Sequence, residues 1–548
     1  MTVSFVHRFL RSLSIVGTVL AIVFFAASLT PSLMPRSYLV QGLLSGVCAA
    51  AGYLLGIGIA ALWRFLELPA LLRRHAAWVE AAILCIGLLV TIASLWNATE
   101  WQNSIRTLWK MEPLDSADPY RLAAIAAVTF LVALLLGRFF YWVCIKSSRF
   151  LARYVPQRVS IILGILVACT LFWSLGQGVM VRMALDAADA SFKQLDALVD
   201  EPEAPGLVTG SPSSLVSWEG LGRQGRHFVT TGPMADDISK FWNAPAEEPI
   251  RVYAGLNNAD TPESRAQLAL RELQRQGGFE RSALVIITPT GTGWVDPEAM
   301  DSLEYLHRGD VASVAVQYSY LTSWLSLLVE PDNGRDTARA LFMAVYGHWQ
   351  TLPKETRPAL YLYGLSLGAL NSEASADIYD MVGDPFQGAL WTGPPFRSTR
   401  WRSITEQRNE GSPAWLPRFR DGSAVRFTNQ DNHLGEAEAP WGPLRIIYLQ
   451  YASDPVVFFD ANAAFREPAW MQKPRGPDVS PEFRWLPVVT MLQLLFDMMT
   501  ATESPLGFGH VYAADDYTDS WVALTDPPDV EPSDVARLKA LLVKPETE

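Results

Sequence analysis

Hydrophobic residues divide the chain into an apolar first third and a mixed remainder. Before residue 190, five apolar stretches approach the length of about 20 residues that a helix needs to cross a lipid bilayer. They run over Leu13–Leu29, Leu39–Trp63, Ala76–Trp96, Leu122–Ile145 and Ser160–Val181. The pattern predicts a multi-span α-helical membrane region over residues 1–190.

In the remainder of the chain, hydrophobic and polar residues follow a different pattern. Residues 191–248 are rich in Pro, Gly, Ser and acidic groups and are predicted to be a linker, although Trp218, Phe228 and Val229 indicate that part of it packs. From residue 249 to 548, short buried runs alternate with amphipathic segments. The predicted strands are Pro249–Leu256, Ala283–Thr288, Val311–Tyr318, Ala359–Tyr363, Gly388–Thr392 and Leu444–Tyr451, and the predicted helices are Pro262–Gln276, Asp336–Gln350 and Leu367–Met381. This alternation favours a mostly parallel sheet with helices on both faces.

Charge follows the same division. Residues 1–200 carry a net charge of +6 and residues 201–548 a net charge of −18, which gives −12 for the chain. The acidic balance argues against a nucleic-acid partner, because neutralising phosphates requires a basic surface. The four cysteines, Cys48, Cys85, Cys144 and Cys169, all lie in the apolar third without metal-ligand spacing, so we expect neither a metal nor another cofactor.

Lysine and arginine counts predict the orientation in the membrane. The N-terminal segment, the second loop and the fourth loop are rich in these residues, which are Arg8, Arg11, Arg64, Arg73, Arg74, Lys146, Arg149, Arg153 and Arg158. The alternating bias predicts a cytoplasmic N-terminus, and five crossings then place everything after Val181 on the outer side. Trp96, Trp101 and Trp109, around the third loop, are typical of an interfacial aromatic belt.

A candidate nucleophile lies in the second half of the chain. Ser366 is the centre of Gly364-Leu365-Ser366-Leu367-Gly368, between the predicted strand Ala359–Tyr363 and the helix from Leu367. This is the strand–turn–helix context that a nucleophile elbow requires in an α/β-hydrolase fold. The motif therefore predicts Ser366 as a catalytic serine.

A serine hydroxyl needs a base, and that base needs an orienting acid. In this fold the chain order is Ser, acid, His, and only His433 and His510 follow Ser366. His510 lies on a glycine-flanked loop after the last strands, which suits a base that presents its ring to the nucleophile. Asp454 follows the strand Leu444–Tyr451 and is the predicted acid.

The tetrahedral intermediate also needs hydrogen-bond donors for its oxyanion. The backbone N–H of Leu367, directly after the nucleophile, is one predicted donor. The second is expected in the turn after an earlier strand, at Thr290 or Gly291.

Beyond the elbow, the chain resembles the bacterial membrane-anchored α/β-hydrolases, which join an N-terminal multi-span region to a C-terminal catalytic domain. The segments that carry the resemblance are Pro31-Ser32-Leu33-Met34-Pro35-Arg36, Gly220-Leu221-Gly222-Arg223-Gln224-Gly225-Arg226, Gln317-Tyr318-Ser319-Tyr320, Ser323-Trp324, the elbow, Trp391-Thr392-Gly393-Pro394-Pro395-Phe396, Ser453-Asp454-Pro455 and Arg475-Gly476-Pro477-Asp478. The resemblance implies an α/β-hydrolase fold over residues 249–548, a multi-pass protein of the bacterial inner membrane, and Ser366, Asp454 and His510 at the triad positions. Phe508 departs from the family pattern, where a second histidine is expected shortly before the catalytic one.

These observations predict a membrane-anchored serine hydrolase that cleaves carboxylic esters through an acyl-enzyme. The expected partners are the lipid bilayer and a small-molecule or lipid ester. An acyltransferase with the same triad, and a membrane transport or scaffold protein with an inactive hydrolase domain, remain alternatives. The segment Arg397–Gly442 is either a lid or a packed insertion, and the oligomeric state is open.

Overall fold

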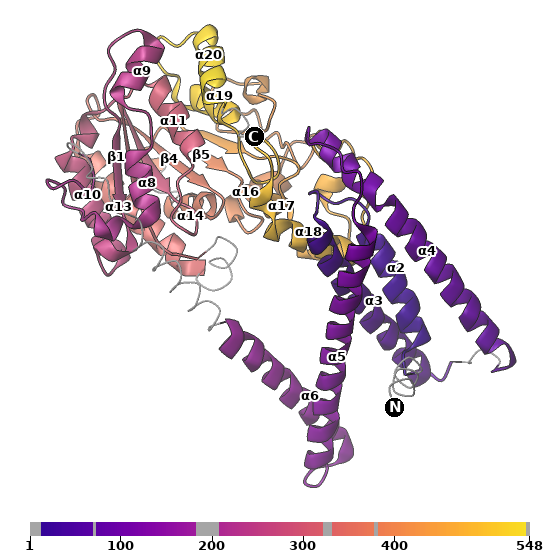
Figure 1. Ribbon diagram of the computed structural model, residues 1–548. Coiled ribbons are helices and arrows are strands. Elements are labelled where there is room, and N and C mark those ends of the chain that lie inside the picture. Colours follow the sequence, from indigo (N-terminus) through magenta and orange to yellow (C-terminus); the bar gives the residue numbers. More distant parts are fainter. Residues whose placement is uncertain (1–11, 69–72, 182–207, 322–330, 378–381, 544–548) are drawn as a thin grey trace. The chain divides into compact units, whose positions relative to one another are not determined.

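The computed structural model describes residues 12–68, 73–181, 208–321, 331–377 and 382–543 (Figure 1). They divide into two compact units. The membrane unit comprises Met1–Ala184 together with Phe459–Met471 and Pro477–Thr500, and the sheet unit comprises Leu185–Phe458, Gln472–Gly476 and Ala501–Glu548. This division differs from the predicted one, because two segments expected in the catalytic domain belong to the membrane unit.

The N-terminal part of the membrane unit is helical. Its helices are α2 (Ile15–Ser28), α3 (Tyr38–Phe65), α4 (Arg73–Leu108), α5 (Pro119–Leu151) and α6 (Gln157–Trp173), and α6 continues into a π-helical turn, η1 (Ser174–Val181). Among the described residues, four stretches are long and apolar enough to cross a membrane, namely Tyr38–Phe65, Ala81–Leu108, Pro119–Leu151 and Gln157–Gly176. The helix α2 has only 14 residues, or about 21 Å at 1.5 Å per residue. The predicted five-helix region is therefore present with a short first helix.

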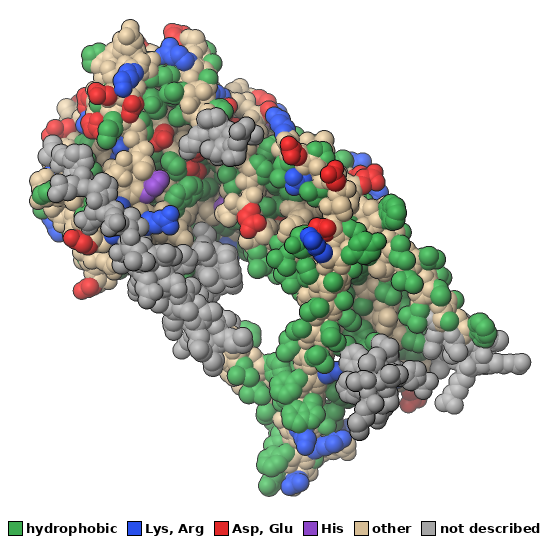
Figure 2. All heavy atoms as spheres, viewed as in Figure 1, with side chains coloured by type: hydrophobic (Ala, Val, Ile, Leu, Met, Phe, Trp, Pro, Cys, Tyr) green, Lys and Arg blue, Asp and Glu red, His purple; other side chains and the backbone are tan. Residues whose placement is uncertain are grey.

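The surface of this unit is apolar over the helices. Figure 2 shows hydrophobic side chains over their visible faces. Large side chains such as Leu54, Trp96 and Trp142 are more than 45% exposed. Such outward-facing residues suit a lipid environment.

Trp109 does not fit the predicted aromatic belt. The helix α4 continues through Trp96 and Trp101 to Leu108, so these two tryptophans lie on a helix rather than in a loop. Trp109 is only 2% exposed, and its indole N–H donates to the carbonyl oxygen of Asp478 at 3.0 Å. Its role is internal packing within the membrane unit.

Glycines set the spacing of the membrane helices. A Cβ on Gly46 of α3 would lie 2.7 Å from the carbonyl oxygen of Ala126 on α5. One on Gly56 of α3 would lie 2.6 Å from the Cα of Gly17 on α2. Small residues at such positions allow helix backbones to approach closely in a membrane.

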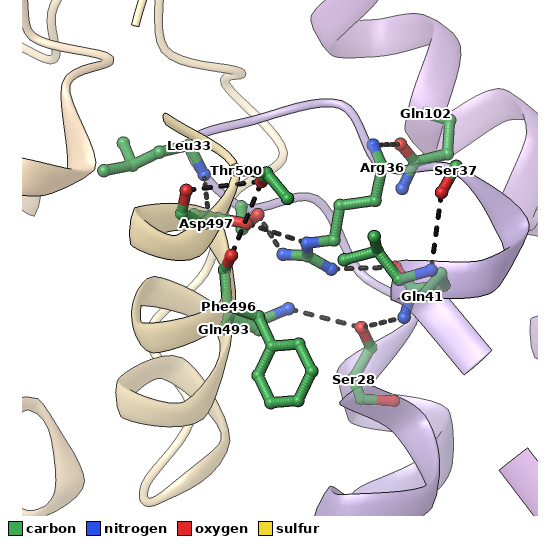
Figure 3. A network of polar contacts seen from close by, with 12 residues as sticks. Ser28, Leu33, Arg36, Ser37, Gln41, Gln102, Gln493, Phe496, Asp497 and Thr500 are labelled. Atoms are coloured by element: carbon green, nitrogen blue, oxygen red, sulfur yellow. Dashed lines mark hydrogen bonds and ion pairs between the residues drawn. The ribbon is translucent and has the colours of Figure 1, made fainter. Parts of the chain in front are cut away.

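A buried ion pair joins the hairpin between α2 and α3 to the helix α18 (Val489–Met499) (Figure 3). Arg36 Nε and Asp497 Oδ1 are 2.8 Å apart, and both side chains are fully buried. The backbone N–H of Leu33 donates to the other oxygen of Asp497 at 3.1 Å, and Arg36 Nη1 donates to Gln41 Oε1 at 2.7 Å. The network explains the Pro31–Arg36 motif, because these residues form the binding site for α18.

The described part of the sheet unit contains a seven-stranded parallel sheet. Its strands are β1 (Ile250–Ala254), β2 (Ala283–Thr288), β3 (Val311–Val316), β4 (Ala359–Leu365), β5 (Gly388–Thr392), β6 (Val425–Thr428) and β7 (Arg445–Leu449), in the order β1-β3-β2-β4-β5-β7-β6. Every residue of β1, β2, β3 and β5 is buried, as expected for a parallel sheet covered on both faces.

Helices pack in two groups around this sheet (Figure 1). In one group α10 (Pro262–Arg275) contacts α13 (Pro331–Thr351), which contacts α14 (Leu367–Ser375). In the other, α11 (Pro297–Leu306) contacts α19 (Ala514–Thr525), which contacts α20 (Pro532–Leu542). The remaining described α-helices of the unit are α8 (Gly222–Thr230), α9 (Ala235–Trp242), α16 (Thr399–Glu406) and α17 (Pro455–Phe458).

Two segments differ from their predictions. The described part of the predicted linker, residues 208–248, forms α8 and α9 and buries Trp218, Phe228 and Ile238 in the core of the sheet unit. The predicted strands are all present, but the segment Arg397–Gly442 also supplies the edge strand β6. Residues 191–207, Ser323, Trp324 and the predicted helix end at Met381 lie outside the described residues.

Candidate active site

Ser366 occupies a sharp turn between β4 and α14. Its backbone has φ 57° and ψ −125°, a region that a residue with a Cβ adopts only at an energetic cost. Its backbone N–H donates to the carbonyl oxygen of Thr392 at 2.9 Å, which fixes the turn beside the end of β5. The residue is 4% exposed.

The two glycines of the motif make this turn possible. A Cβ on Gly364 would lie 2.4 Å from the carbonyl carbon and oxygen of Gly368. A Cβ on Gly368 would lie 2.1 Å from the carbonyl oxygen of Thr288, the last residue of β2. Both distances are far below van der Waals contact, so the elbow tolerates only glycine at these positions.

Asp454 and His510 form a buried pair. Asp454 lies five residues after the end of β7 and is fully buried. Its Oδ2 is 2.6 Å from His510 Nδ1, and its Oδ1 accepts a hydrogen bond from the backbone N–H of Val456 at 2.8 Å. With Nδ1 bound to a carboxylate, the neutral imidazole carries its proton there and leaves Nε2 as the acceptor.

The free nitrogen of His510 is also enclosed. Nε2 is buried and has no hydrogen-bond partner among the described residues. The imidazole lies against Gly393, where an added Cβ would be 2.8 Å from its Cε1 atom. Because the N–H of Ser366 bonds the carbonyl of Thr392, Ser366 and His510 adjoin consecutive residues at the end of β5.

His433, the other histidine after Ser366, lies elsewhere. Its Nδ1 is 2.7 Å from Glu436 Oε1, and its backbone N–H donates to Thr428 Oγ1 at 3.3 Å. The hydrogen bond from His433 lowers the pKa of the Glu436 carboxyl. The structure thus pairs Asp454 with His510, and His433 with a partly exposed glutamate.

The two predicted oxyanion donors have different surroundings. Leu367 is the first residue of α14, where backbone N–H groups lack an acceptor within the helix. The turn after β2 lies beside the elbow, since Gly368 approaches the carbonyls of both Thr288 and Pro289. Within that turn, the Thr290 N–H already donates to the carbonyl of Trp294 at 3.0 Å. Thr290 and Gly291 both stay candidates for the second donor.

Glycines also shape the loop that carries His510. Gly507 and Gly509 have φ of 84° and 57°, values that favour glycine. The N–H of Gly509 donates to Ser453 Oγ at 3.0 Å, which ties the loop to the segment of Asp454. Phe508 stands two residues before His510, where the family pattern has a histidine, and forms a short antiparallel bridge with Val511.

One residue of the site did not emerge from the sequence. Tyr512 is 2% exposed, and its hydroxyl donates to Asp454 Oδ2 at 2.6 Å. Burial and the negative charge of Asp454 raise the pKa of Tyr512 well above its usual value. Its position two residues after His510 was the available signal, but an aromatic residue there is also typical of a core.

The segment Arg397–Gly442 packs into the sheet unit instead of covering the site as a free lid. Trp401 is buried and donates from its indole nitrogen to Gln450 Oε1 at 2.7 Å. Phe427 of β6 stacks on Tyr448 of β7 with ring centroids 5.0 Å apart. These side chains are part of the core of the sheet unit, as in a packed insertion.

Comparison with known proteins matches two parts of the chain. Residues 250–538 match a family model described as "Alpha/beta-hydrolase family". Residues 29–233 match the model described as the N-terminus of that family. The first match runs from β1 to α20 and contains Ser366, Asp454 and His510. No curated protein and no solved structure matches the chain.

Proposed function

The chain belongs to the alpha/beta-hydrolase family, and on that premise we propose that it is a membrane-anchored serine hydrolase with Ser366 as nucleophile, His510 as base and Asp454 as orienting acid. The observation that carries the proposal is the Asp454–His510 hydrogen bond of 2.6 Å, which leaves Nε2 buried and without a partner. The strained backbone of Ser366 supports it, because such strain is concentrated at functional sites.

The proposed reaction is acyl transfer to water. His510 Nε2 takes the proton of Ser366, whose Oγ bonds to the ester carbonyl carbon, while the amide of Leu367 and that of Thr290 or Gly291 stabilise the oxyanion. His510 then gives that proton to the leaving alkoxide, which departs as an alcohol. Water attacks the acyl-enzyme by the same route and restores Ser366, and Asp454 remains ionised throughout.

Labelling with a fluorophosphonate probe tests the nucleophile. We expect the full-length wild type to label in detergent or membranes, and Ser366→Ala not to label. Ser375→Ala is a matched control on α14, because the Ser375 hydroxyl donates to the carbonyl of Ser372 at 2.8 Å and is not part of the proposed triad. His510→Gln should slow labelling by a factor of about 10³ or more. Equal labelling of Ser366→Ala and wild type would contradict the assignment.

Two further classes of function are distinguished by the fate of the acyl group. For a hydrolase, an acyl-enzyme formed from a p-nitrophenyl ester releases free acid at the same rate with or without an added alcohol. For an acyltransferase, a long-chain alcohol or lysolipid captures most of the acyl group as a new ester. A protein with an inactive domain neither labels nor turns over. We favour carboxylic esters near the membrane surface because the catalytic unit is joined to apolar spans.

We also propose that the sheet unit lies on the outer side of a bacterial inner membrane. The short α2 does not affect this proposal. The end of α5 carries Lys146 and Arg149, the loop carries Arg153, and the start of α6 carries Arg158. These charges favour the cytoplasmic side for the loop, and α6 would then cross outward whether or not α2 spans. Protease added to sealed spheroplasts should digest the sheet unit, and protection of it would contradict the orientation.

A further inference from the structure

The carboxylate of Asp454 has two hydrogen-bond donors at the same oxygen. His510 Nδ1 and the Tyr512 hydroxyl both lie 2.6 Å from Oδ2. The other oxygen accepts from the backbone amides of Val456 and Val457 at 2.8 and 3.4 Å. The histidine thus shares its acceptor with a phenol.

The site offers Asp454 no cation other than this histidine. Among the described residues, its one ion-pair partner is His510, although the aspartate is fully buried. A buried carboxylate is costly unless hydrogen bonds stabilise it. Tyr512 remains protonated, because burial and Asp454 raise its pKa, so it acts only as a donor toward that carboxylate.

The ring of Tyr512 is itself firmly held. It stacks on Tyr451 with centroids 4.3 Å apart. The Tyr451 hydroxyl accepts from the backbone N–H of Ala513 at 3.0 Å and donates to Asp516 of α19. Gly393 leaves room for the phenol, since a Cβ there would lie 3.0 Å from the Tyr512 hydroxyl oxygen. The hydroxyl is therefore fixed before any substrate binds.

We propose that Tyr512 is a positioning residue of the triad, which holds Asp454 Oδ2 toward His510 Nδ1 and shares the negative charge of that oxygen. The inference rests on the proposed function of Ser366, His510 and Asp454. Two consequences separate it from a structural role. Loss of the hydroxyl frees the carboxylate to turn, which slows attack by Ser366. It also leaves more negative charge on Oδ2, which favours the imidazolium over the neutral base.

The experiment compares pH profiles of fluorophosphonate labelling in the full-length protein. Tyr512→Phe keeps the ring and removes one donor, while His510, Val456 and Val457 still bond the carboxylate. We expect the plateau rate to fall roughly tenfold, which matches the loss of one hydrogen bond to a charged group. We also expect the acid limb of the pH profile, where the labelling rate falls as the pH decreases, to move to higher pH by about half a unit. The position of the limb does not depend on how much protein is folded, so it remains informative in a less stable variant.

Tyr517→Phe is the matched control. The Tyr517 hydroxyl is equally buried and donates to a different carboxylate, Asp296 Oδ2, at 2.9 Å. Tyr451, Asp516, Tyr517 and Asp296 are further titratable groups around Tyr512, and burial raises the pKa of Asp516 to about 7. Repeating the comparison in an Asp516→Asn background removes its contribution, and the limb should still move.

The outcomes separate the two proposals. If wild type labels and Tyr512→Phe shows the same rate and limb, the role of Tyr512 is overturned while the triad stands. The role of Tyr512 is also overturned if Tyr512→Phe and Tyr517→Phe lower the labelling rate equally and neither variant moves the acid limb of the pH profile. If wild type does not label at any pH, the proposed function fails, and the role of Tyr512 fails with it.

Discussion

The carbonyl oxygen of Thr288 lies 2.1 Å from the position that a Cβ on Gly368 would take. Thr288 ends β2 and Gly368 lies in the first turn of α14, so this contact fixes the turn at Ser366 against the neighbouring strand. Backbone atoms cannot yield as a flexible side chain would.

We therefore expect Gly368→Ala to displace the elbow and to lower the fluorophosphonate labelling rate at least a hundredfold, since a displacement of about 1 Å has this effect on catalysis. Gly347→Ala on α13 is the matched control, because a Cβ there meets no atom within 4 Å. That variant should label normally and gain up to about 1 kcal/mol of stability from helix propensity. Normal labelling of Gly368→Ala would show that the elbow has more room than the structure indicates.

The ion pair between Arg36 and Asp497 predicts a large effect on stability. Removal of one partner leaves a buried charge, which costs about 3–5 kcal/mol. Asp497→Ala should therefore lower the thermal midpoint of the full-length protein in detergent substantially. The double variant Arg36→Met, Asp497→Leu removes both charges and should recover much of the loss. Arg121→Gln breaks an exposed pair with Asp118 and should cost less than about 1 kcal/mol.

Asp516 predicts a dependence of stability on pH. Burial raises its pKa to about 7, from about 4 in an unfolded chain. The folded state holds the proton more tightly, so the contribution to stability is complete below pH 4 and is lost as the pH rises to 7. Asp516→Asn should remove a difference of about 3 kcal/mol in unfolding free energy between pH 5 and pH 8.

The difference between wild type and Asp516→Asn is the quantity to measure. Burial lowers the pKa of His307 to about 4, so this residue contributes with the opposite sign. Its contribution to the stability of the folded state is lost as the pH falls below 6.5. Thermal midpoints of both proteins at several pH values isolate the aspartate. Parallel curves for the two proteins would contradict the raised pKa of Asp516.

A fragment that starts at residue 191 should not be a well-behaved soluble enzyme. It contains α18, whose Val489 packs with Leu44 and Cys48 of α3 in the membrane unit. Without residues 1–190 this apolar face is exposed and Asp497 lacks Arg36. We expect the fragment to aggregate when expressed alone, and to be recovered in membranes when residues 1–190 are co-expressed. A soluble, monomeric fragment that labels would contradict this prediction.

Local patterns in the sequence identified most of the sheet and the elbow. The strands before Ser366 and Asp454 are continuous apolar runs, and Gly364 and Gly368 flank the serine, so their signals lie within a few residues. The strand β6 was missed because it has four residues, one of them Arg426. The glycine-flanked loop favoured His510 over His433, and the structure pairs His510 with Asp454.

The surface that α18 packs against could not be predicted from the sequence. An apolar helix face does not identify the surface that covers it. That surface is formed by the motif Pro31–Arg36 and by α3, more than 400 residues earlier in the chain. Tyr512 was missed for a similar reason, because its role depends on the position of Asp454.

The separation of 461 positions from Arg36 to Asp497 also has a consequence for biosynthesis. At about 5–20 residues per second, a ribosome needs roughly 20 to 90 seconds to reach Asp497 after it has made Arg36. During that interval the first helices are inserted while their site for α18 stays empty. Completion of the membrane unit thus waits until most of the sheet unit has been made, and a nascent chain stalled before residue 489 lacks the carboxylate that pairs with Arg36.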